Sequence, residues 1–428
     1  MPLAYGVFLW CTTRHRHQTD YNYNYNYNYN YNYNYNYNYN YNYNYNYNYN
    51  YNYNYNDFPM NIDAISHLQT QVLWASFAVS IAFGWVSQRS HFCTMGAFSD
   101  IVSMGDWTRM RMWALAVGVA ILGFYGLAFF ELINPSDSIH ANGRVIWLSA
   151  LVGGAMFGFG MVLASGCGSK TLLRIGAGSL KSLVVFVFMG LFAFMTLRGI
   201  TAVARTYSVD LVNFQMDTAL LPHWLASQLG AQANTVGLLS ALVVGGGLVL
   251  WALKGEGFIR SGSLFGGLGV GACIVAIWWV SGHLGFVPEH PETLEATYLV
   301  TNSASMESLT FTAPLAYVIN WLIYFSDVSN VLSLGVVSVF GVVSGGAMYA
   351  WHSKTFRWDG FSSTQDTALH MAGGALMGVG GVTAMGCTIG QGLSGLSTLS
   401  LTSLFAVAGI TCGALGGFKF QMWLLMRD

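Results

Sequence analysis

The sequence predicts an all-α polytopic integral membrane protein made of two related halves. Only 8% of its residues are charged and 54% are hydrophobic, whereas soluble domains carry roughly 25% charged residues. Residues 145–169, 218–253 and 367–418 contain no Asp, Glu, Lys or Arg. Each stretch is longer than the roughly 20 apolar residues with which a helix crosses a bilayer. A large soluble protein with buried helices is therefore excluded.

Apolar segments divide the chain after Met60 into a series of predicted membrane helices. Tryptophan and tyrosine residues near several ends fit the aromatic belts of a membrane protein. The acidic segment 285–308 holds no Lys or Arg and is expected outside, with the turn at 254–260 inside. The expected spans lie near residues 70–87, 112–131, 146–165, 181–200, 236–253, 262–284, 309–325, 331–350, 367–385 and 400–424.

The first 59 residues have a different composition from the rest of the chain. Residues 21–56 are eighteen consecutive Tyr-Asn dipeptides, a tract that has no apolar face to bury. The segment before the tract lacks the cleavage site of a signal peptide. We expect residues 1–59 to form a low-complexity, disordered leader, and we favour Met60 as the true start. The membrane domain is then 60–428, with halves at about 60–205 and 236–428.

An internal repeat relates the two halves. The sequence GGAMFGFG at 153–160 corresponds to GGALMGVG at 373–380, and both are followed by matching Val, Ala and Gly-Cys positions at an ungapped offset of 220 residues. Two pseudo-symmetric repeats of this kind favour an inverted topology, with the substrate site near the membrane midplane. The GxxxG spacing within each repeat indicates close helix packing.

Each repeat runs into a break that carries a cysteine. Gly166 and Gly168 flank Cys167, and Gly386 precedes Cys387, with Gly390 three residues further on. A break at membrane depth must be buried in protein or line a cavity. We expect short re-entrant helices at 168–179 and 388–399 that meet at the centre. Their N-termini would direct free N–H groups and partial positive charge at the meeting point, which favours an anion.

A third cysteine, Cys93, follows an apolar span within the sequence QRSHFC at 88–93. A single membrane cysteine is most often a small hydrophobe, but three beside helix breaks predict a functional set. Cys273 and Cys412 lack such breaks and are interpreted as packing residues. His91 and Lys170 are candidate entrance residues, with Arg174 beside Lys170. His370 is interpreted as a helix-contact residue.

These segments resemble the signature regions of YeeE/YedE sulfur-transport proteins. The resemblance rests on QRSHFC, on SGC at 165–167 and above all on GCTIGQGLSG at 386–395. It implies inward passage of thiosulfate across the bacterial cytoplasmic membrane, with Cys93, Cys167 and Cys387 as the transport cysteines. It also implies a cytoplasmic TusA-like sulfurtransferase as a partner. A neutral thiol donates a weak hydrogen bond to such an anion, and weak sites permit release.

The sequence argues against some functions other than thiosulfate transport and leaves others open. A net charge of −1 with no basic tract argues against nucleic-acid binding. No CxxC, Walker or HExxH motif occurs, so we expect no cofactor, no metal and no enzymatic activity. The alternatives left open are a membrane thiol–disulfide oxidoreductase, a channel for another solute such as sulfite, selenite or a neutral molecule, and a structural scaffold.

Overall fold

The computed structural model describes residues 62–426 except 257, 261, 292 and 328–329. These residues belong to the second of the two units into which the chain divides, Pro59–Asp428. The predicted leader and the start at Met60 lie outside the described residues.

Long helices account for most of the described chain, and each predicted span corresponds to one of them. The long helices are α2 (Ile62–Arg89), α4 (Thr108–Phe129), α5 (Trp147–Leu163), α7 (Leu180–Arg198), α10 (Ala233–Leu253), α11 (Ser263–Trp279), α12 (Thr312–Ile323), α13 (Leu334–His352), α14 (Thr364–Thr383) and α15 (Leu401–Leu425). Shorter helical pieces are α3 (Thr94–Met104), η2 (Pro135–Asp137), α6 (Gly168–Gly176), α8 (Ile200–Thr206), η3 (Val209–Leu211), α9 (Leu221–Leu229), η4 (Phe258–Arg260), η5 (Val280–Leu284) and η6 (Gly390–Gly395).

The placement of proline explains why these helices are uninterrupted. The chain has only 7 prolines in 428 residues. Three of them lie in the first turns of helices, Pro135 in η2, Pro222 in α9 and Pro314 in α12, where the missing N–H would have no intrahelical partner. Interior positions therefore keep their backbone hydrogen bonds, which a helix in lipid cannot replace with water.

Eight segments of the described chain are long and apolar enough to cross a membrane, which makes this a multi-pass membrane protein. Two predicted spans do not reach that standard. Helix α12 has 12 residues and covers about 18 Å at 1.5 Å per residue, less than the roughly 30 Å of a bilayer core. Helix α14 begins with polar residues, among them Asp366 and His370, and is not among the eight.

Four two-residue strands form two small antiparallel ribbons in the connections. Strand β1 (Arg144–Val145) pairs with β2 (Phe214–Gln215), with Arg144 opposite Gln215. Strand β3 (Phe286–Val287) pairs with β4 (Thr297–Tyr298), with Phe286 opposite Tyr298. These ribbons fix loops between helices, and their residues Val145, Val287 and Tyr298 are buried.

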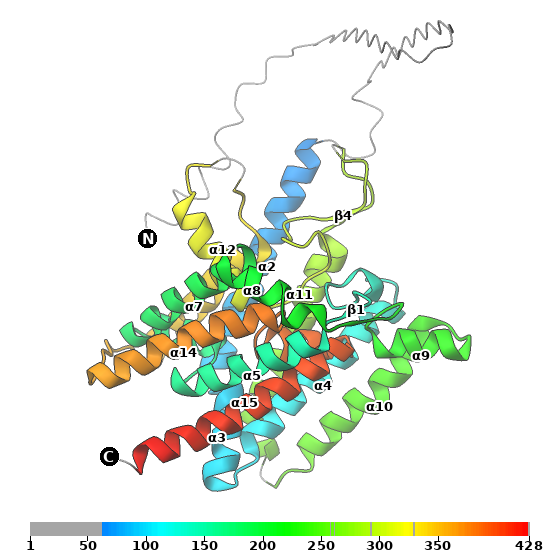
Figure 1. Cartoon of the computed structure of the whole chain (residues 1–428). Coiled ribbons are helices and arrows are strands. Elements are labelled where there is room, and N and C mark those ends of the chain that lie inside the picture. The colour runs from blue at the N-terminus through cyan, green and yellow to red at the C-terminus, as the bar shows by residue number, and fades with distance from the viewer. Residues whose placement is uncertain (1–61, 257, 261, 292, 328–329, 427–428) are drawn as a thin grey trace, which may run out of the picture. The chain divides into compact units, whose positions relative to one another are not determined.

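The glycine-rich helices of the two repeats pack directly on one another. Figure 1 shows α5 between α14 and α15, and both neighbours contact it. A Cβ atom at Gly153 would lie 2.5 Å from the amide nitrogen of Ala384, and one at Gly160 would lie 2.7 Å from the carbonyl oxygen of Gly373. A side chain at either position would clash, so only glycine permits this approach. Close backbone contact of this kind favours helix association in lipid.

The GxxxG pair of each repeat faces the helix that follows the cysteine-bearing break of the other repeat. Gly154 and Gly158 of α5 pack against the backbone of α15, and Gly374 and Gly378 of α14 pack against that of α7. Each half therefore contributes the helix after its break to the packing of the other half. The inverted relation between the halves stays a prediction.

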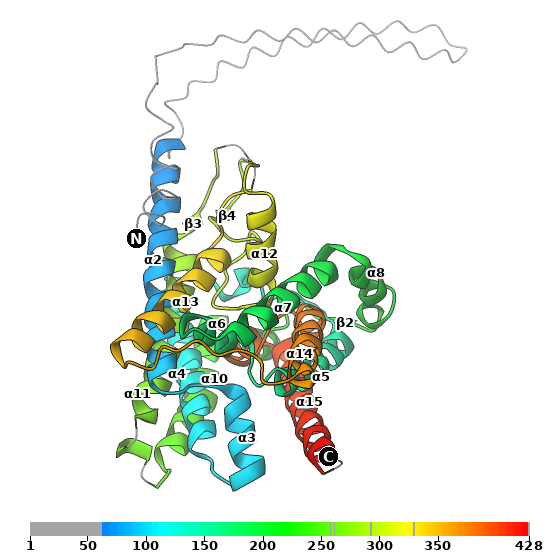
Figure 2. The ribbon, with the colours of Figure 1, turned by 90° about the vertical axis from the view of Figure 1, so that its left-hand side faces the viewer.

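A second group of helices lies on the side of α2, the helix that ends before Cys93. Helix α2 packs along α13 and α11, and α4 packs against α10 and α11. Figure 2 shows α2 running past these helices toward the short helix α3. This group places the third break next to the two repeat breaks.

The packing of α5 on α14 predicts a sharp difference between two glycine substitutions. Gly160→Ala forces a methyl group against the carbonyl of Gly373, and overpacking of this kind costs about 1–3 kcal/mol. Gly246→Ala on α10 has no atom within 4 Å of the new Cβ and is expected to be neutral or slightly stabilising.

Thermal unfolding of the detergent-solubilised variants, followed by size-exclusion chromatography, measures this difference. Equal melting temperatures for the two variants would contradict the close packing of α5 on α14.

Candidate functional site

Three helix breaks in the described chain share one backbone geometry. Helices α2, α5 and α14 each end two residues before a residue with positive φ, namely His91 at 52°, Ser165 at 55° and Met385 at 57°. In each case a cysteine follows two residues after that position. The third cysteine, which lies outside the repeat, therefore has the same local structure as the two within it.

Hydrogen bonds at the three breaks follow the Schellman pattern. The residue after the positive-φ position donates its N–H to a carbonyl five residues earlier, which satisfies one of the free carbonyls at the helix end. These bonds are Phe92 N to Ser87 O at 3.0 Å, Gly166 N to Met161 O at 2.9 Å and Gly386 N to Gly381 O at 2.7 Å. The chain can thus end three helices inside the protein without stranding their backbone groups.

A new helical turn begins at each cysteine. The carbonyls of Cys93, Cys167 and Cys387 accept the N–H four residues on, at 3.0, 2.9 and 2.8 Å. These turns lead into α3, α6 and the π-helical segment η6. The sequence predicted a helix after Cys167 and after Cys387, and the one after Cys93 was not predicted. Each cysteine therefore occupies the N-cap region, where free N–H groups and the positive end of the helix dipole face outward.

The thiols accept hydrogen bonds from these free N–H groups. Gly96 N donates to Cys93 Sγ at 3.4 Å and Gly390 N donates to Cys387 Sγ at 3.4 Å. The corresponding N–H of Lys170 interacts with the thiol of Cys167. A thiol that accepts through sulfur still has its S–H free to donate, so each can contact an anion.

The three breaks bring their cysteines together. Cys167 interacts with Cys93 and with Cys387, so the three cysteines are neighbours. Cys167 Sγ lies 3.3 Å from Ser169 Oγ. Cys167 and Cys387 are fully buried, whereas Cys93 is partly exposed. The site is therefore a cluster of three thiols that can be approached from the side of Cys93.

The loop before α12 closes the cluster on another side. The N–H of Phe311 interacts with the Cys387 thiol, and a Cβ at Gly168 would lie 3.7 Å from Phe311 Cβ. Ser394 Oγ donates to Leu309 O at 2.7 Å, which ties this loop to η6. Residues 309–311 were expected at the start of a membrane span, and their role at the thiols was not predicted. Their apolar composition gave no signal for it.

Basic side chains gather beside the thiols. Lys170 interacts electrostatically with Cys93, Cys167, Arg109 and Arg174, and the exposed His91 interacts with Lys170 and Arg109. Arg109 is paired with Asp100 at 3.1 Å. In the part of the chain that the structure describes, Lys170 and Arg174 form no ion pair with a carboxylate. This region therefore carries net positive charge next to the thiols.

Two side chains, the half-buried Arg174 and the buried Gln391, hold the repeat breaks in place. Arg174 Nη1 donates to the carbonyl of Ser165 at 2.8 Å, and Gln391 Nε2 donates to the carbonyl of Met385 at 3.0 Å. Gln391 also accepts from Ser403 Oγ at 2.6 Å, which links it to α15. Arg174 thus has a structural contact in addition to its charge. The role of Gln391 was missed in the sequence because its partners are backbone carbonyls.

The remaining candidate residues lie apart from the cluster. Cys273 is buried in α11, and Cys412 is exposed on α15. His370 Nδ1 lies 3.0 Å from Asp366 Oδ1, and that carboxylate also pairs with Lys181 of α7 at 2.8 Å. Asp366 therefore links α14 to α7, whereas the contacts of His370 lie within α14 and with Phe361 just before it.

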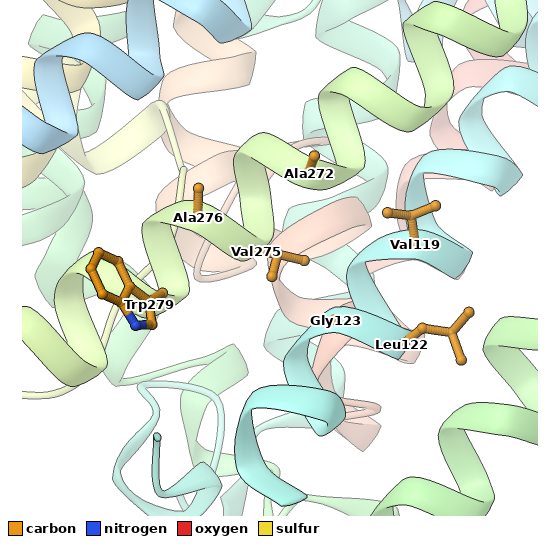
Figure 3. Close-up of a pocket in the computed structure, with 7 residues that line it drawn as sticks. All are labelled: Val119, Leu122, Gly123, Ala272, Val275, Ala276 and Trp279. Carbon is orange, nitrogen blue, oxygen red and sulfur yellow. The ribbon is translucent and has the colours of Figure 1, made fainter. Parts of the chain in front are cut away.

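An apolar groove lies between α4 and α11. It has a volume of about 600 Å³ and is lined by Val119, Leu122, Gly123, Ala272, Val275, Ala276 and Trp279 (Figure 3). Its lining suits hydrocarbon and offers nothing to balance the charge of an anion. The thiol cluster, with its donors and nearby cations, is the candidate site.

The fold and the site together describe a multi-pass membrane protein whose helix breaks bring three cysteines and basic side chains together. Comparison with known proteins agrees with this class. The sequence model of the sulphur transport family matches residues 89–415, and the chain belongs to that family.

Two similar relatives are thiosulfate transporters named TsuA. The protein of Escherichia coli (strain K12) is 26% identical over 326 residues, covering 72% of this chain and 83% of the relative. That of Spirochaeta thermophila is 25% identical over 342 residues, covering 78% and 94%. The probable transporter YedE of Escherichia coli (strain K12) is 30% identical over 101 residues, 23% of each chain. The resemblance found in the sequence is thereby confirmed.

The contact between Cys93 and Cys167 predicts selective cross-linking. Mild oxidation of the purified protein is expected to join these two cysteines, because their thiols are neighbours. Peptide mass spectrometry detects the linked pair, and Cys93→Ser should abolish it. Recovery of Cys273 or Cys412 as the main linked partner would contradict the arrangement of the breaks.

Proposed function

We propose that this protein carries thiosulfate inward across the cytoplasmic membrane of a bacterium, past Cys93, Cys167 and Cys387. The observation that carries the proposal is the meeting of three cysteine-bearing helix breaks in a member of the sulphur transport family. Two relatives are named thiosulfate transporters, and we take thiosulfate as the substrate from them. The supporting chemistry is the match between thiol donors and the soft terminal sulfur of the anion.

Transport requires binding strong enough for entry and weak enough for release. Full cations in direct contact would hold a divalent anion tightly, whereas a neutral thiol donates only a weak hydrogen bond. Lys170 and Arg174 lie beside the thiols and attract the anion over a longer range. In this mechanism the thiols stay protonated, because a thiolate would repel the dianion.

Three further parts of the proposal come from the sequence. The two halves are related by an inverted repeat, which would place the thiol cluster near the membrane midplane. Gly166, Gly168, Gly386 and Gly390 allow the breaks to form, and His91 and Lys170 lie at the entrance. A cytoplasmic sulfurtransferase similar to TusA receives the anion after passage.

A second function is favoured by the interaction of Cys93 with Cys167. In a thiol–disulfide oxidoreductase, Cys93 and Cys167 would be oxidised to a disulfide while the disulfide of a partner protein is reduced. Alkylation of the protein in membranes, with and without reductant, separates the two functions. Thiols that are free without reductant support transport, and a disulfide that cycles with a partner supports the oxidoreductase.

The proposal predicts a loss of uptake when a thiol of the cluster is removed. Cys167→Ala is expected to reduce thiosulfate uptake about tenfold or more, because a buried donor to the anion is lost. Cys273→Ala is the matched control, since Cys273 is also buried but lies in an unbroken helix.

Uptake of ³⁵S-labelled thiosulfate by cells that lack their own uptake system measures both variants at equal membrane levels. Normal uptake by Cys167→Ala would remove the thiol from the mechanism. Competition with sulfite and selenite in the same cells identifies the preferred anion.

The basic side chains beside the thiols, Lys170 among them, predict a salt-dependent contribution to the uptake rate. Lys170→Gln is expected to slow uptake at low ionic strength by several-fold, and the difference should shrink as salt screens the charge. The control is Lys354→Gln, which removes an exposed charge on the loop after α13. Initial rates in proteoliposomes at several salt concentrations test this, and a salt-independent defect would indicate a structural role for Lys170.

A further inference from the structure

The connection between α7 and α10 begins and ends with a short helix. Figure 2 shows α8 at the end of α7, which it follows after the single residue Gly199, and three residues separate α9 from α10. Both α7 and α10 are long and apolar enough to cross a membrane. Their 19 and 21 residues span about 29 and 32 Å at 1.5 Å per residue, close to the roughly 30 Å of a bilayer core. Helices attached to the ends of these spans therefore lie at the membrane surface.

One face of α8 is apolar and uncovered. Ile200, Val203 and Tyr207 occupy positions i, i+3 and i+7, which places them on one side of the helix. They are 75%, 56% and 77% exposed, so no part of the described chain covers this face. A row of large exposed apolar side chains marks a surface that contacts another protein or a membrane.

The apolar face of α9 is wider than the protein surface that covers it. Pro222 and Ala226 on this face are buried. Leu225 and Leu229 border them on the helix and are exposed, and Trp224 is exposed as well. Helix α9 therefore rests on the protein with one part of its apolar face and leaves the other part free.

Contacts with the protein fix which sides of the connection face outward. Thr201 Oγ1 of α8 lies 2.9 Å from Thr196 Oγ1 of α7. Between the two short helices, the N–H of Leu401 donates to Ala219 O at 2.9 Å, which ties the connection to the start of α15. The uncovered faces of α8 and α9 therefore point away from the protein.

The composition of the connection indicates what covers these faces. Residues 199–232 contain only three charged side chains, and two of them pair, with Arg205 Nε 3.0 Å from Asp210 Oδ2. Tyr207 and Trp224 are residue types enriched where a membrane meets water. Such a surface suits the boundary between lipid headgroups and acyl chains.

The surface also continues one that already faces lipid. Helix α10 crosses the membrane, and its residues Leu239 and Val243 are exposed on the outside of the bundle. Because α9 leads into this helix after three residues, the exposed leucines of α9 extend the lipid-facing surface of α10 to the membrane surface.

We propose that α8 and α9 are interfacial helices that bind phospholipid at the membrane surface. Ile200, Val203 and Tyr207 of α8, with Leu225 and Leu229 of α9, embed between the headgroups and the first part of the acyl chains. This lipid-binding surface is separate from the thiol cluster and does not depend on which anion the protein carries.

Photo-labelling of the full chain in nanodiscs tests the proposal. The nanodiscs contain a phospholipid with a photoreactive diazirine in the upper part of one acyl chain, and peptide mass spectrometry maps the labelled residues. We expect label on the exposed faces of α8 and α9, as on Leu239 and Val243 of α10, which are the positive control. The exposed acidic residues Glu289 and Glu295 should remain unlabelled.

Two substitutions on α8 form a matched pair. Val203→Asp places a charge in the apolar face, where transfer to lipid is costly, and is expected to reduce labelling of α8 several-fold. Thr206→Asp adds the same charge at a residue that is also exposed but lies outside the row of apolar side chains, and should leave the labelling unchanged. Undiminished labelling of α10 establishes that each variant is folded and inserted.

Two results would overturn the proposal. If α10 is labelled while α8 and α9 are not, their exposed faces lie in water or against another protein, including a second copy of this chain. If Val203→Asp and Thr206→Asp are labelled equally on α8, its apolar face does not determine the contact with lipid.

Discussion

The structure depends on one constraint, which is that a helix broken inside a membrane must satisfy its own backbone groups. Water is absent there, and each unpaired carbonyl or N–H costs free energy. The three breaks meet this constraint in the same way, with Schellman hydrogen bonds at the end of one helix and a cysteine at the start of the next. Arg174 and Gln391 satisfy further carbonyls from the side.

The same constraint creates the site. A helix that restarts within the protein has N–H groups without intrahelical partners, and the thiols of the cysteines occupy the position where a serine or aspartate would cap. Sulfur is a weak acceptor, so part of the positive potential of each helix end remains available. Three such ends, with Lys170 nearby, provide a favourable environment for an anion without a tightly bound counter-ion. The glycine contacts between α5 and α14 hold the ends at this spacing.

The sequence predicted the helices and the two repeat breaks because both leave strong local signals. Charge-free stretches indicate spans, and the ungapped repeat indicates equivalent positions such as Cys167 and Cys387. The common geometry of the three breaks could not be predicted, since His91, Ser165 and Met385 take a positive φ that usually belongs to glycine. Helix α12 was expected to begin at residue 309 and begins at Thr312. An apolar run does not reveal that the residues around Phe311 lie beside the thiols.

The central claim is that the anion passes through the thiol cluster, and protection of the cysteines by substrate tests it most directly. The protein in proteoliposomes is treated with a small membrane-permeant alkylating reagent, with and without thiosulfate, and the modification of each cysteine is followed by mass spectrometry. The account predicts that thiosulfate slows modification of Cys93, the partly exposed member of the cluster, and leaves the exposed Cys412 unchanged. Equal rates at Cys93 with and without thiosulfate, under conditions in which the anion is transported, would contradict it.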